Sequence, residues 1–200
     1  EKVNNSVDEK TGVPIVSLYG SAKKPTSEQL IDVDVVIFDI QDVGVRFYTY
    51  ISSLYYMLEA CGENNKAVIV LDRPNPNSFV DGPMLESEFK SFVGIIPTPI
   101  AHGMTVGELA KMMLGEKWLK DGIQCKLEVI PMKNYSHNMS YILPIKPSPN
   151  LPTQNAITWY PSLCLFEGTV VSVGRGTPMP FEVIGNPEMK EYPFKFTPVS

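Results

Sequence analysis

The chain has 200 residues, of which 44% are hydrophobic and 20% are charged. That hydrophobic fraction is enough to build a buried core, which excludes a wholly disordered chain. The net charge is −5, with only three arginines and no basic run, so we expect no nucleic-acid partner. No apolar stretch approaches the roughly 20 residues of a membrane span, so we expect none.

Cysteine and histidine give no metal signal. The three cysteines are widely spaced and form neither a disulfide framework nor a CxxC pair. The two histidines, His102 and His137, are too far apart for a zinc-binding helix. We therefore expect no metal ion.

The first 143 residues alternate between strand and helix patterns. A strand is predicted at 14–19 and a short helix at 26–31. Two short, mostly β-branched runs then predict strands that are buried on both faces of a parallel sheet. They lie at 33–38 and 67–71. Between them, apolar residues nearly all round at 47–61 predict a helix packed on the sheet.

A further helix is predicted to start at Thr105. Thr105 and Glu108 have the spacing of a capping box, in which the hydroxyl and the carboxylate satisfy free N–H groups of the first turn. A fourth strand is predicted at 126–130. This order predicts a doubly wound α/β domain.

Proline marks a change in the chain near residue 144. Ten of the 18 prolines lie in residues 144–200, a region that we predict to be extended and turn-rich. We therefore place a domain boundary between 143 and 144, with the start of a smaller second domain at 144–200.

Polar residues follow both of the buried strands. Asp39, Gln41 and Asp42 follow the first, and Asp72, Arg73 and Asn75 follow the second. Ligands of open parallel sheets bind beyond the carboxyl ends of the strands, so the two clusters predict one crevice. The alternative is that these residues only cap strand ends and form local Asp–Arg pairs.

The three arginines all lie in polar, turn-rich segments, whereas lysine serves elsewhere. They are Arg46, Arg73 and Arg175. The planar guanidinium matches a carboxylate in a way that lysine does not, so each is a candidate for binding an anionic ligand. The alternative is that each holds a loop through an internal contact.

His102 precedes a predicted helix, where it could bind a substrate hydroxyl or shuttle a proton, or be purely structural. Tyr48 and Tyr160 could stack on a sugar ring. The chain has no phosphate-binding loop and no nucleophile elbow, and Gly174-Arg-Gly176 is not a dinucleotide fingerprint.

Six longer strings, taken in order, resemble the bacterial exo-β-N-acetylmuramidase family (NamZ), formerly a domain of unknown function. They are FDIQDVGVRFYTY at 38–50, LDRPNP at 71–76, HGMT at 102–105, KPSPNLP at 146–152, YPSLCLFEGT at 160–169 and GRGT at 174–177. The resemblance covers essentially the whole chain.

The resemblance implies a Rossmann-like parallel sheet with helices on both faces, followed by the start of a smaller C-terminal domain. It implies an exported enzyme, secreted or periplasmic, that releases N-acetylmuramic acid from non-reducing ends of peptidoglycan fragments without a cofactor. In that setting Asp42, Asp39 and His102 are the catalytic candidates. The substrate-binding candidates are Gln41, Arg46, Tyr48, Asp72, Arg73, Asn75, Asn150, Glu167 and Arg175.

The family pattern begins upstream of Glu1, with a Glu-His-Gly segment whose Glu is the favoured catalytic acid. We therefore expect this chain to hold most of a substrate crevice without the full catalytic set. The alternative function is an α/β module that binds a sugar or nucleotide without chemistry. A dinucleotide-dependent oxidoreductase is a weaker third alternative, because the GxGxxG fingerprint is missing.

Overall fold

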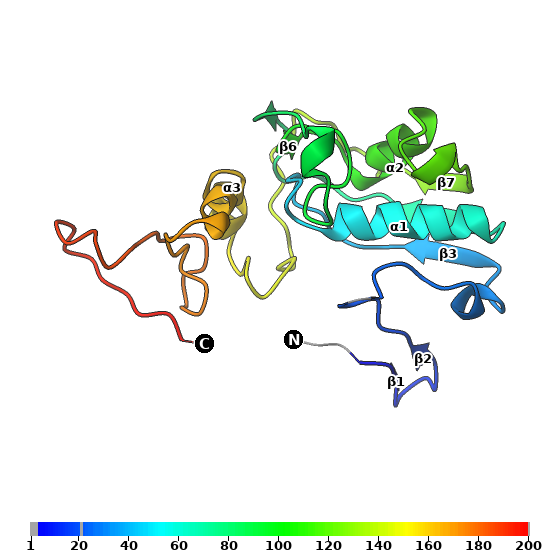
Figure 1. Cartoon of the computed structure of the whole chain (residues 1–200), viewed down its shortest axis with the longest axis horizontal. Coiled ribbons are helices and arrows are strands. Elements are labelled where there is room, and N and C mark those ends of the chain that lie inside the picture. The colour runs from blue at the N-terminus through cyan, green and yellow to red at the C-terminus, as the bar shows by residue number, and fades with distance from the viewer. Residues whose placement is uncertain (1–3, 21, 200) are drawn as a thin grey trace.

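The computed structural model describes residues 4–20 and 22–199. Its centre is a parallel sheet in the order β3-β4-β7, formed by Val35–Phe38, Ala67–Leu71 and Lys126–Ile130 (Figure 1). The predicted strands at 33–38, 67–71 and 126–130 are thus confirmed, and so is the α/β class. Because β3 and β4 are parallel neighbours, the residues after both strands emerge at the same edge of the sheet.

The two long helices pack on one face of this sheet. Helix α1 (Tyr50–Glu63) and helix α2 (Val106–Gly115) share a single buried cluster with the inward residues of the strands, such as Phe38 and Val70. Outward residues remain open, and Ile37 is 59% exposed. Burial alternates along β3 and β7, so that only every second side chain is covered. In the described chain the long helices therefore cover one face of the sheet, whereas we predicted both.

Helix α2 begins as predicted. The Thr105 hydroxyl accepts a hydrogen bond from the N–H of Glu108 at 3.2 Å, and the Glu108 carboxylate accepts one from the N–H of Thr105 at 2.9 Å. This reciprocal pair is the capping box that the spacing predicts.

The N-terminal segment differs from its prediction. The run at 14–19 forms only a two-residue strand, β2 (Pro14–Ile15), which pairs with β1 (Ser6–Val7) in an antiparallel hairpin outside the main sheet. The strand ends early because Ser17 donates its N–H to the Asn5 side chain at 2.7 Å instead of to a strand backbone. The helix at 26–31 is a single 3₁₀ turn, η1 (Glu28–Leu30).

A second hairpin positions the loop that follows β3. Strand β5 (Val80–Asp81) pairs with β6 (Ala101–His102), and Ala101 also bridges to Val45. The chain between and after these strands includes two 3₁₀ turns, η2 (Ser87–Phe89) and η3 (Lys120–Gly122). The bridge brings His102 beside Asp42 in the loop after β3, although the two residues are 60 positions apart in sequence.

The proline-rich region contains a helix, which corrects our prediction of extended backbone. Helix α3 (Gln154–Leu163) continues into the 3₁₀ turn η4 (Cys164–Gly168), and Thr153 caps it by accepting from the N–H of Ala156 at 3.0 Å. Residues after 168 are turn-rich, as predicted. The domain boundary between 143 and 144 stays a prediction.

Pro161 lies inside α3 and has no N–H, so the Ile157 carbonyl loses its usual helical donor. The side chain of Asn77, from the loop after β4, donates to that carbonyl at 3.0 Å and to the Val43 carbonyl at 2.9 Å. Asn77 thereby ties α3 to the loop after β3. Apolar residues of both regions, including Val43 and Ile157, share a second buried cluster.

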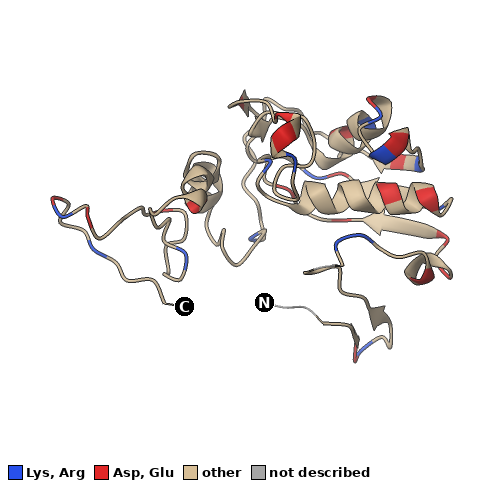
Figure 2. Ribbon diagram, in the orientation of Figure 1, with Lys and Arg blue, Asp and Glu red and all other residues tan. Residues whose placement is uncertain are grey.

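Figure 2 shows lysine and arginine scattered along the described chain.

None of the described helices combines the length and the apolar character needed to cross a membrane.

Candidate active site

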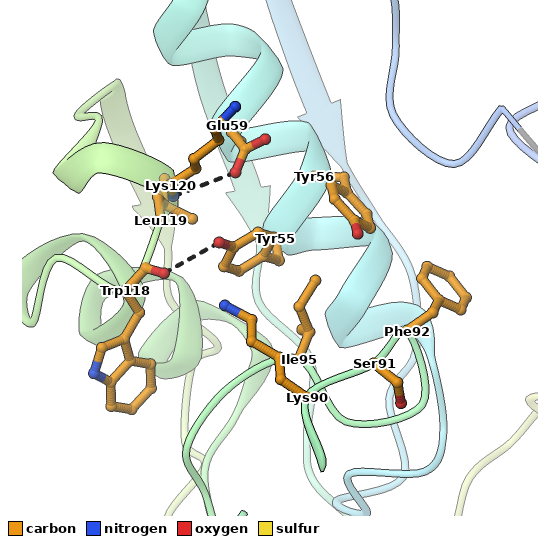
Figure 3. Close-up of a pocket in the computed structure, with 10 residues that line it drawn as sticks. All are labelled: Tyr55, Tyr56, Glu59, Lys90, Ser91, Phe92, Ile95, Trp118, Leu119 and Lys120. Carbon is orange, nitrogen blue, oxygen red and sulfur yellow. Dashed lines mark hydrogen bonds between the residues drawn. The ribbon is translucent and has the colours of Figure 1, made fainter. Parts of the chain in front are cut away.

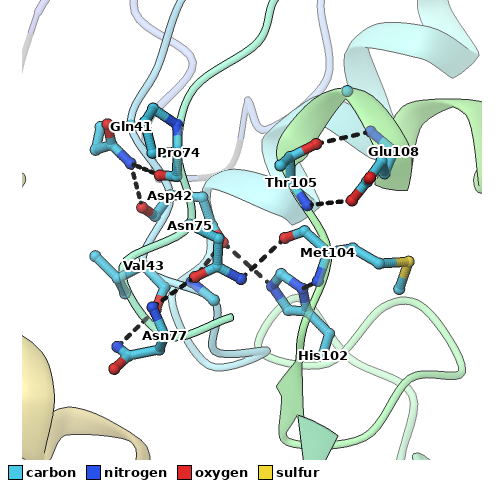
Figure 4. A network of polar contacts seen from close by, with 12 residues as sticks. Gln41, Asp42, Val43, Pro74, Asn75, Asn77, His102, Met104, Thr105 and Glu108 are labelled. Carbon is cyan, nitrogen blue, oxygen red and sulfur yellow. Dashed lines mark hydrogen bonds and ion pairs between the residues drawn. The ribbon is translucent and has the colours of Figure 1, made fainter. Parts of the chain in front are cut away.

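Asp42 is the centre of a polar network at the carboxyl edge of the sheet (Figure 4). Its side chain is buried, with only 3% of the residue exposed. One carboxylate oxygen, Oδ2, accepts from the N–H of Gly44 at 2.7 Å and lies 3.2 Å from Nε2 of His102. The other oxygen, Oδ1, is buried without a hydrogen-bond partner among the described residues. A buried carboxylate oxygen without a partner is costly, and a catalytic role is one of the explanations for such a group.

The buried His102 side chain fixes the position of the Asp42 carboxylate. Its Nδ1 accepts from the N–H of Met104 at 3.3 Å, so in the neutral imidazole the proton lies on Nε2 and is donated to Asp42. The His102 side chain is fully buried, with 0% exposed. The geometry therefore gives His102 a positioning role, and direct catalysis by its imidazole stays a prediction.

The amide side chains near Asp42 are used to hold loops together. Gln41 donates to the carbonyls of Asp42 and Pro74, both at 2.7 Å. Asn75 donates to the Met104 carbonyl at 3.0 Å, and its Oδ1 accepts from the N–H of Asn77 at 2.8 Å. These bonds join the loops after β3 and β4 to the segment before α2.

Gly44 is required for the close approach of these two loops. Its φ of +80° favours glycine, and a Cβ at this position would lie 2.2 Å from Oδ1 of Asn75. The glycine thus fixes the path of the backbone whose N–H binds Asp42.

Asp72 caps the N-terminus of α2. Its Oδ1 accepts from the N–H of Gly107 at 2.8 Å and its Oδ2 accepts from the Thr105 hydroxyl at 2.8 Å. Both oxygens are therefore engaged at the N-terminus of α2, where a negative charge is also favoured by the helix dipole. This geometry matches the capping alternative for Asp72.

Asp39 and Arg73 form an ion pair at the rim of the same edge. Nη2 of Arg73 lies 2.6 Å from Oδ1 of Asp39, and Nε donates to the same oxygen at 2.7 Å. Both side chains are more than two-fifths exposed, so they remain accessible to a ligand. The structure thus brings together residues from both predicted clusters: Asp42, Gln41 and Asn75 inside, and Asp39 with Arg73 outside.

The other predicted site residues lie apart from this network. Arg175 pairs with Glu167 at 2.7 Å on the C-terminal part of the chain, and Asn150 is exposed. Arg46 is buried and donates to the carbonyls of Thr98 and Pro83.

Tyr48 and Tyr160 pack edge to face, with ring centroids 6.0 Å apart, between the loop after β3 and α3. Burial raises the pKa of both phenols. The Tyr48 hydroxyl donates to the Pro147 carbonyl at 2.8 Å, which ties the proline-rich segment to this loop. This arrangement joins the two parts of the chain and leaves little free ring surface on Tyr160, which is 5% exposed.

Two pockets lie outside the Asp42 network. The larger, of ≈ 420 Å³, lies against α1 and contains none of the predicted site residues (Figure 3). The second, of ≈ 350 Å³, is lined by Arg46. Among the described residues, no group of three or more His, Cys, Asp or Glu is arranged to hold a metal ion.

Sequence reasoning missed Asn77, whose amide links the loops after β3 and β4 to α3. The signal in the sequence was the alternation of proline and asparagine at 74–77. Proline interrupts regular backbone hydrogen bonding, so buried backbone carbonyls near such a turn need side-chain donors, which asparagine supplies.

The chain matches two family models, which together cover most of its length. Residues 1–155 match the N-terminal domain of exo-beta-N-acetylmuramidase NamZ, and residues 158–197 match its C-terminal domain. The chain is also 50% identical over 196 residues to the peptidoglycan beta-N-acetylmuramidase NamZ of Bacillus subtilis (strain 168), an alignment that covers 95% of this chain and 46% of that protein.

Two crystal structures of DUF1343 family proteins from Bacteroides fragilis are also similar. One has a TM-score of 0.92 and 54% identity, covering 97% of this chain and 54% of the other. The second has a TM-score of 0.84 and 41% identity, covering 90% and 48%. The chain spans about half the length of these relatives. On the family models and this identity, the chain belongs to the exo-β-N-acetylmuramidase NamZ family.

Proposed function

We propose that the protein is an exo-acting glycoside hydrolase that releases N-acetylmuramic acid from the non-reducing ends of peptidoglycan fragments of the MurNAc-GlcNAc type. The observation that carries this proposal is the match of the chain to both domains of the NamZ family, together with 50% identity to a peptidoglycan beta-N-acetylmuramidase.

Glycoside hydrolysis commonly uses two carboxyl groups on either side of the scissile bond. Asp42 is our candidate for one of them, because Gly44 and His102 fix one of its oxygens and leave the other unpaired. In this role Oδ1 of Asp42 would accept a proton from water or attack the sugar carbon, while His102 keeps the carboxylate in place.

The exposed Asp39–Arg73 pair is our candidate for contacting polar groups of the substrate. It lies at the same edge of the sheet, and both side chains are accessible to solvent. An ion pair presents a donor and an acceptor together, which suits neighbouring hydroxyl and amide groups of a sugar.

We also propose that the protein is exported, secreted or periplasmic, and serves turnover and recycling of the cell wall. The reason is the location of the proposed substrate, because peptidoglycan lies outside the cytoplasmic membrane.

The test is release of N-acetylmuramic acid from MurNAc-GlcNAc, with the reversed disaccharide GlcNAc-MurNAc as the matched control. Both should be given to the 200-residue chain and to a protein of the relatives' full length. We expect the longer protein to cleave the first disaccharide and leave the second intact. Binding of MurNAc-GlcNAc without cleavage by the longer protein would instead favour the non-catalytic binding module.

A further inference from the structure

Among the described residues, Arg46 differs from the other two arginines in having no acidic partner. Arg73 pairs with Asp39 and Arg175 pairs with Glu167, but no carboxylate of the described residues forms an ion pair with Arg46. Yet Arg46 is the most buried of the three, with 5% exposed. A buried charge is normally compensated by an opposite charge.

The hydrogen bonds of Arg46 leave part of its guanidinium unused. Nη1 donates to the carbonyls of Thr98 and Pro83, whereas Nε is buried without a partner among the described residues. Burial lowers the pKa of Arg46, but an arginine side chain still carries its charge at neutral pH. The hydrogen-bond partners of the positive charge among the described residues are therefore neutral carbonyls.

The guanidinium lines a pocket of ≈ 350 Å³, which we call the Arg46 pocket. Its other walls are mainly apolar and include Phe47, Leu85 and Phe89. The Phe47 ring centroid lies 5.6 Å from the guanidinium carbon, which helps to hold the group in position. Glu86 also lines the pocket but forms no ion pair with Arg46 in the described structure.

Gly94 leaves space beside the free nitrogen. A Cβ at this position would lie 3.6 Å from Nε of Arg46 and 3.3 Å from Cδ1 of Leu85. Because glycine has no such atom, residue 94 places no side chain against Nε, which is itself buried.

We propose that the Arg46 pocket binds a carboxylate carried on a short aliphatic group. The guanidinium supplies the charge and the free Nε donor, and the apolar walls accommodate the carbon atoms next to the carboxylate. The proposal rests on the proposed function in its choice of ligand, since peptidoglycan fragments offer this chemistry in the lactyl ether of muramic acid and in the C-terminus of a peptide.

The binding is measurable without catalysis. The three arginines give at most three Nε–H signals in a ¹⁵N-resolved NMR spectrum, and the signal lost in Arg46→Lys identifies Arg46. The probes are N-acetylmuramic acid, N-acetylalanine and, as the neutral control, N-acetylglucosamine. We expect a saturable shift of the Arg46 signal with at least one carboxylate probe and none with N-acetylglucosamine.

The pattern of response identifies the source of the carboxylate. A shift with N-acetylmuramic acid alone assigns the pocket to the lactyl group, and a shift with N-acetylalanine alone assigns it to a peptide terminus. A shift with both supports recognition of the shared carboxylate. No saturable shift with either, or equal shifts with N-acetylglucosamine, overturns the proposal.

Two variants test the geometry. Because Arg46→Lys removes the reporting signal, binding by this variant is measured by isothermal titration calorimetry with the same probes. Arg46→Lys keeps the charge but removes Nε, and should weaken binding about 10–100-fold, whereas the paired control Arg175→Lys should not change it. Gly94→Ala leaves Arg46 intact and fills the space beside Nε, so it should weaken binding at least about tenfold even if Arg46→Lys does not fold. Binding by Gly94→Ala equal to that of the natural protein overturns the proposal. Failure here with intact cleavage of MurNAc-GlcNAc would leave the proposed function standing.

Discussion

The hydrogen bonds of Asn77 predict a specific coupling between two distant positions. Asn77 donates to the Ile157 carbonyl that Pro161 deprives of its helical donor. It also donates to the Val43 carbonyl. If this assignment is right, the stability cost of Asn77→Ala depends on which residue stands at position 161.

The size of the effect can be estimated from the two carbonyls. A buried carbonyl left without a donor costs about 1–3 kcal/mol, so Asn77→Ala should lower the free energy of unfolding by roughly 2–6 kcal/mol. In Pro161→Ala the new N–H can reach the Ile157 carbonyl within α3. The same Asn77→Ala change should then cost only the Val43 part, roughly 1–3 kcal/mol.

The assay is urea unfolding of the natural chain, both single variants and the double variant. Asn150→Ala serves as the matched control, because Asn150 is exposed and its side chain makes no hydrogen bond among the described residues. Additive costs for Asn77→Ala and Pro161→Ala, without a coupling of about 1 kcal/mol or more, would refute the assignment.

Three further predictions concern the site and its surroundings. Gly44→Ala should destabilise the fold more than Gly12→Ala in urea unfolding, because both have positive φ but only Gly44 approaches Asn75. The hydrogen bond that His137 donates to the Glu108 carboxylate raises the pKa of His137. His137→Gln should therefore lower the free energy of unfolding below about pH 6.5, and this loss should vanish as the pH rises through the raised pKa. Alkylation by iodoacetamide at pH 8 should be slow in the folded chain and fast in urea, because burial raises the pKa of every thiol to about 11 or 12. The thiols are those of Cys61, Cys125 and Cys164.

The central sheet and the start of α2 could be predicted because their signals are local. Runs of β-branched residues mark β3 and β4, and the pair Thr105 and Glu108 marks the helix start. Helix α3 could not be predicted in the same way. Pro161 argues against a helix on local grounds, and the bond that compensates for it comes from Asn77, 84 positions earlier.

The site was predictable in its location and less so in its contacts. Parallel pairing of β3 and β4 brings the residues after both strands to one edge, as expected. Sequence could not reveal that His102 reaches Asp42, because this depends on the bridge between Val45 and Ala101. Nor could sequence distinguish Arg46 from the other two arginines. Its lack of an acidic partner among the described residues is a property of the folded chain.

The most direct test of the account compares two aspartates in a protein of the relatives' full length. The rate of N-acetylmuramic acid release from MurNAc-GlcNAc is measured for Asp42→Asn and for Asp39→Asn, with folding checked by circular dichroism. If Asp42 is the catalytic carboxylate, Asp42→Asn should lower the rate about 10²–10⁴-fold, while Asp39→Asn at the exposed rim retains it within about tenfold. A folded Asp42→Asn variant that keeps its rate, beside an Asp39→Asn variant that loses it, would contradict the account.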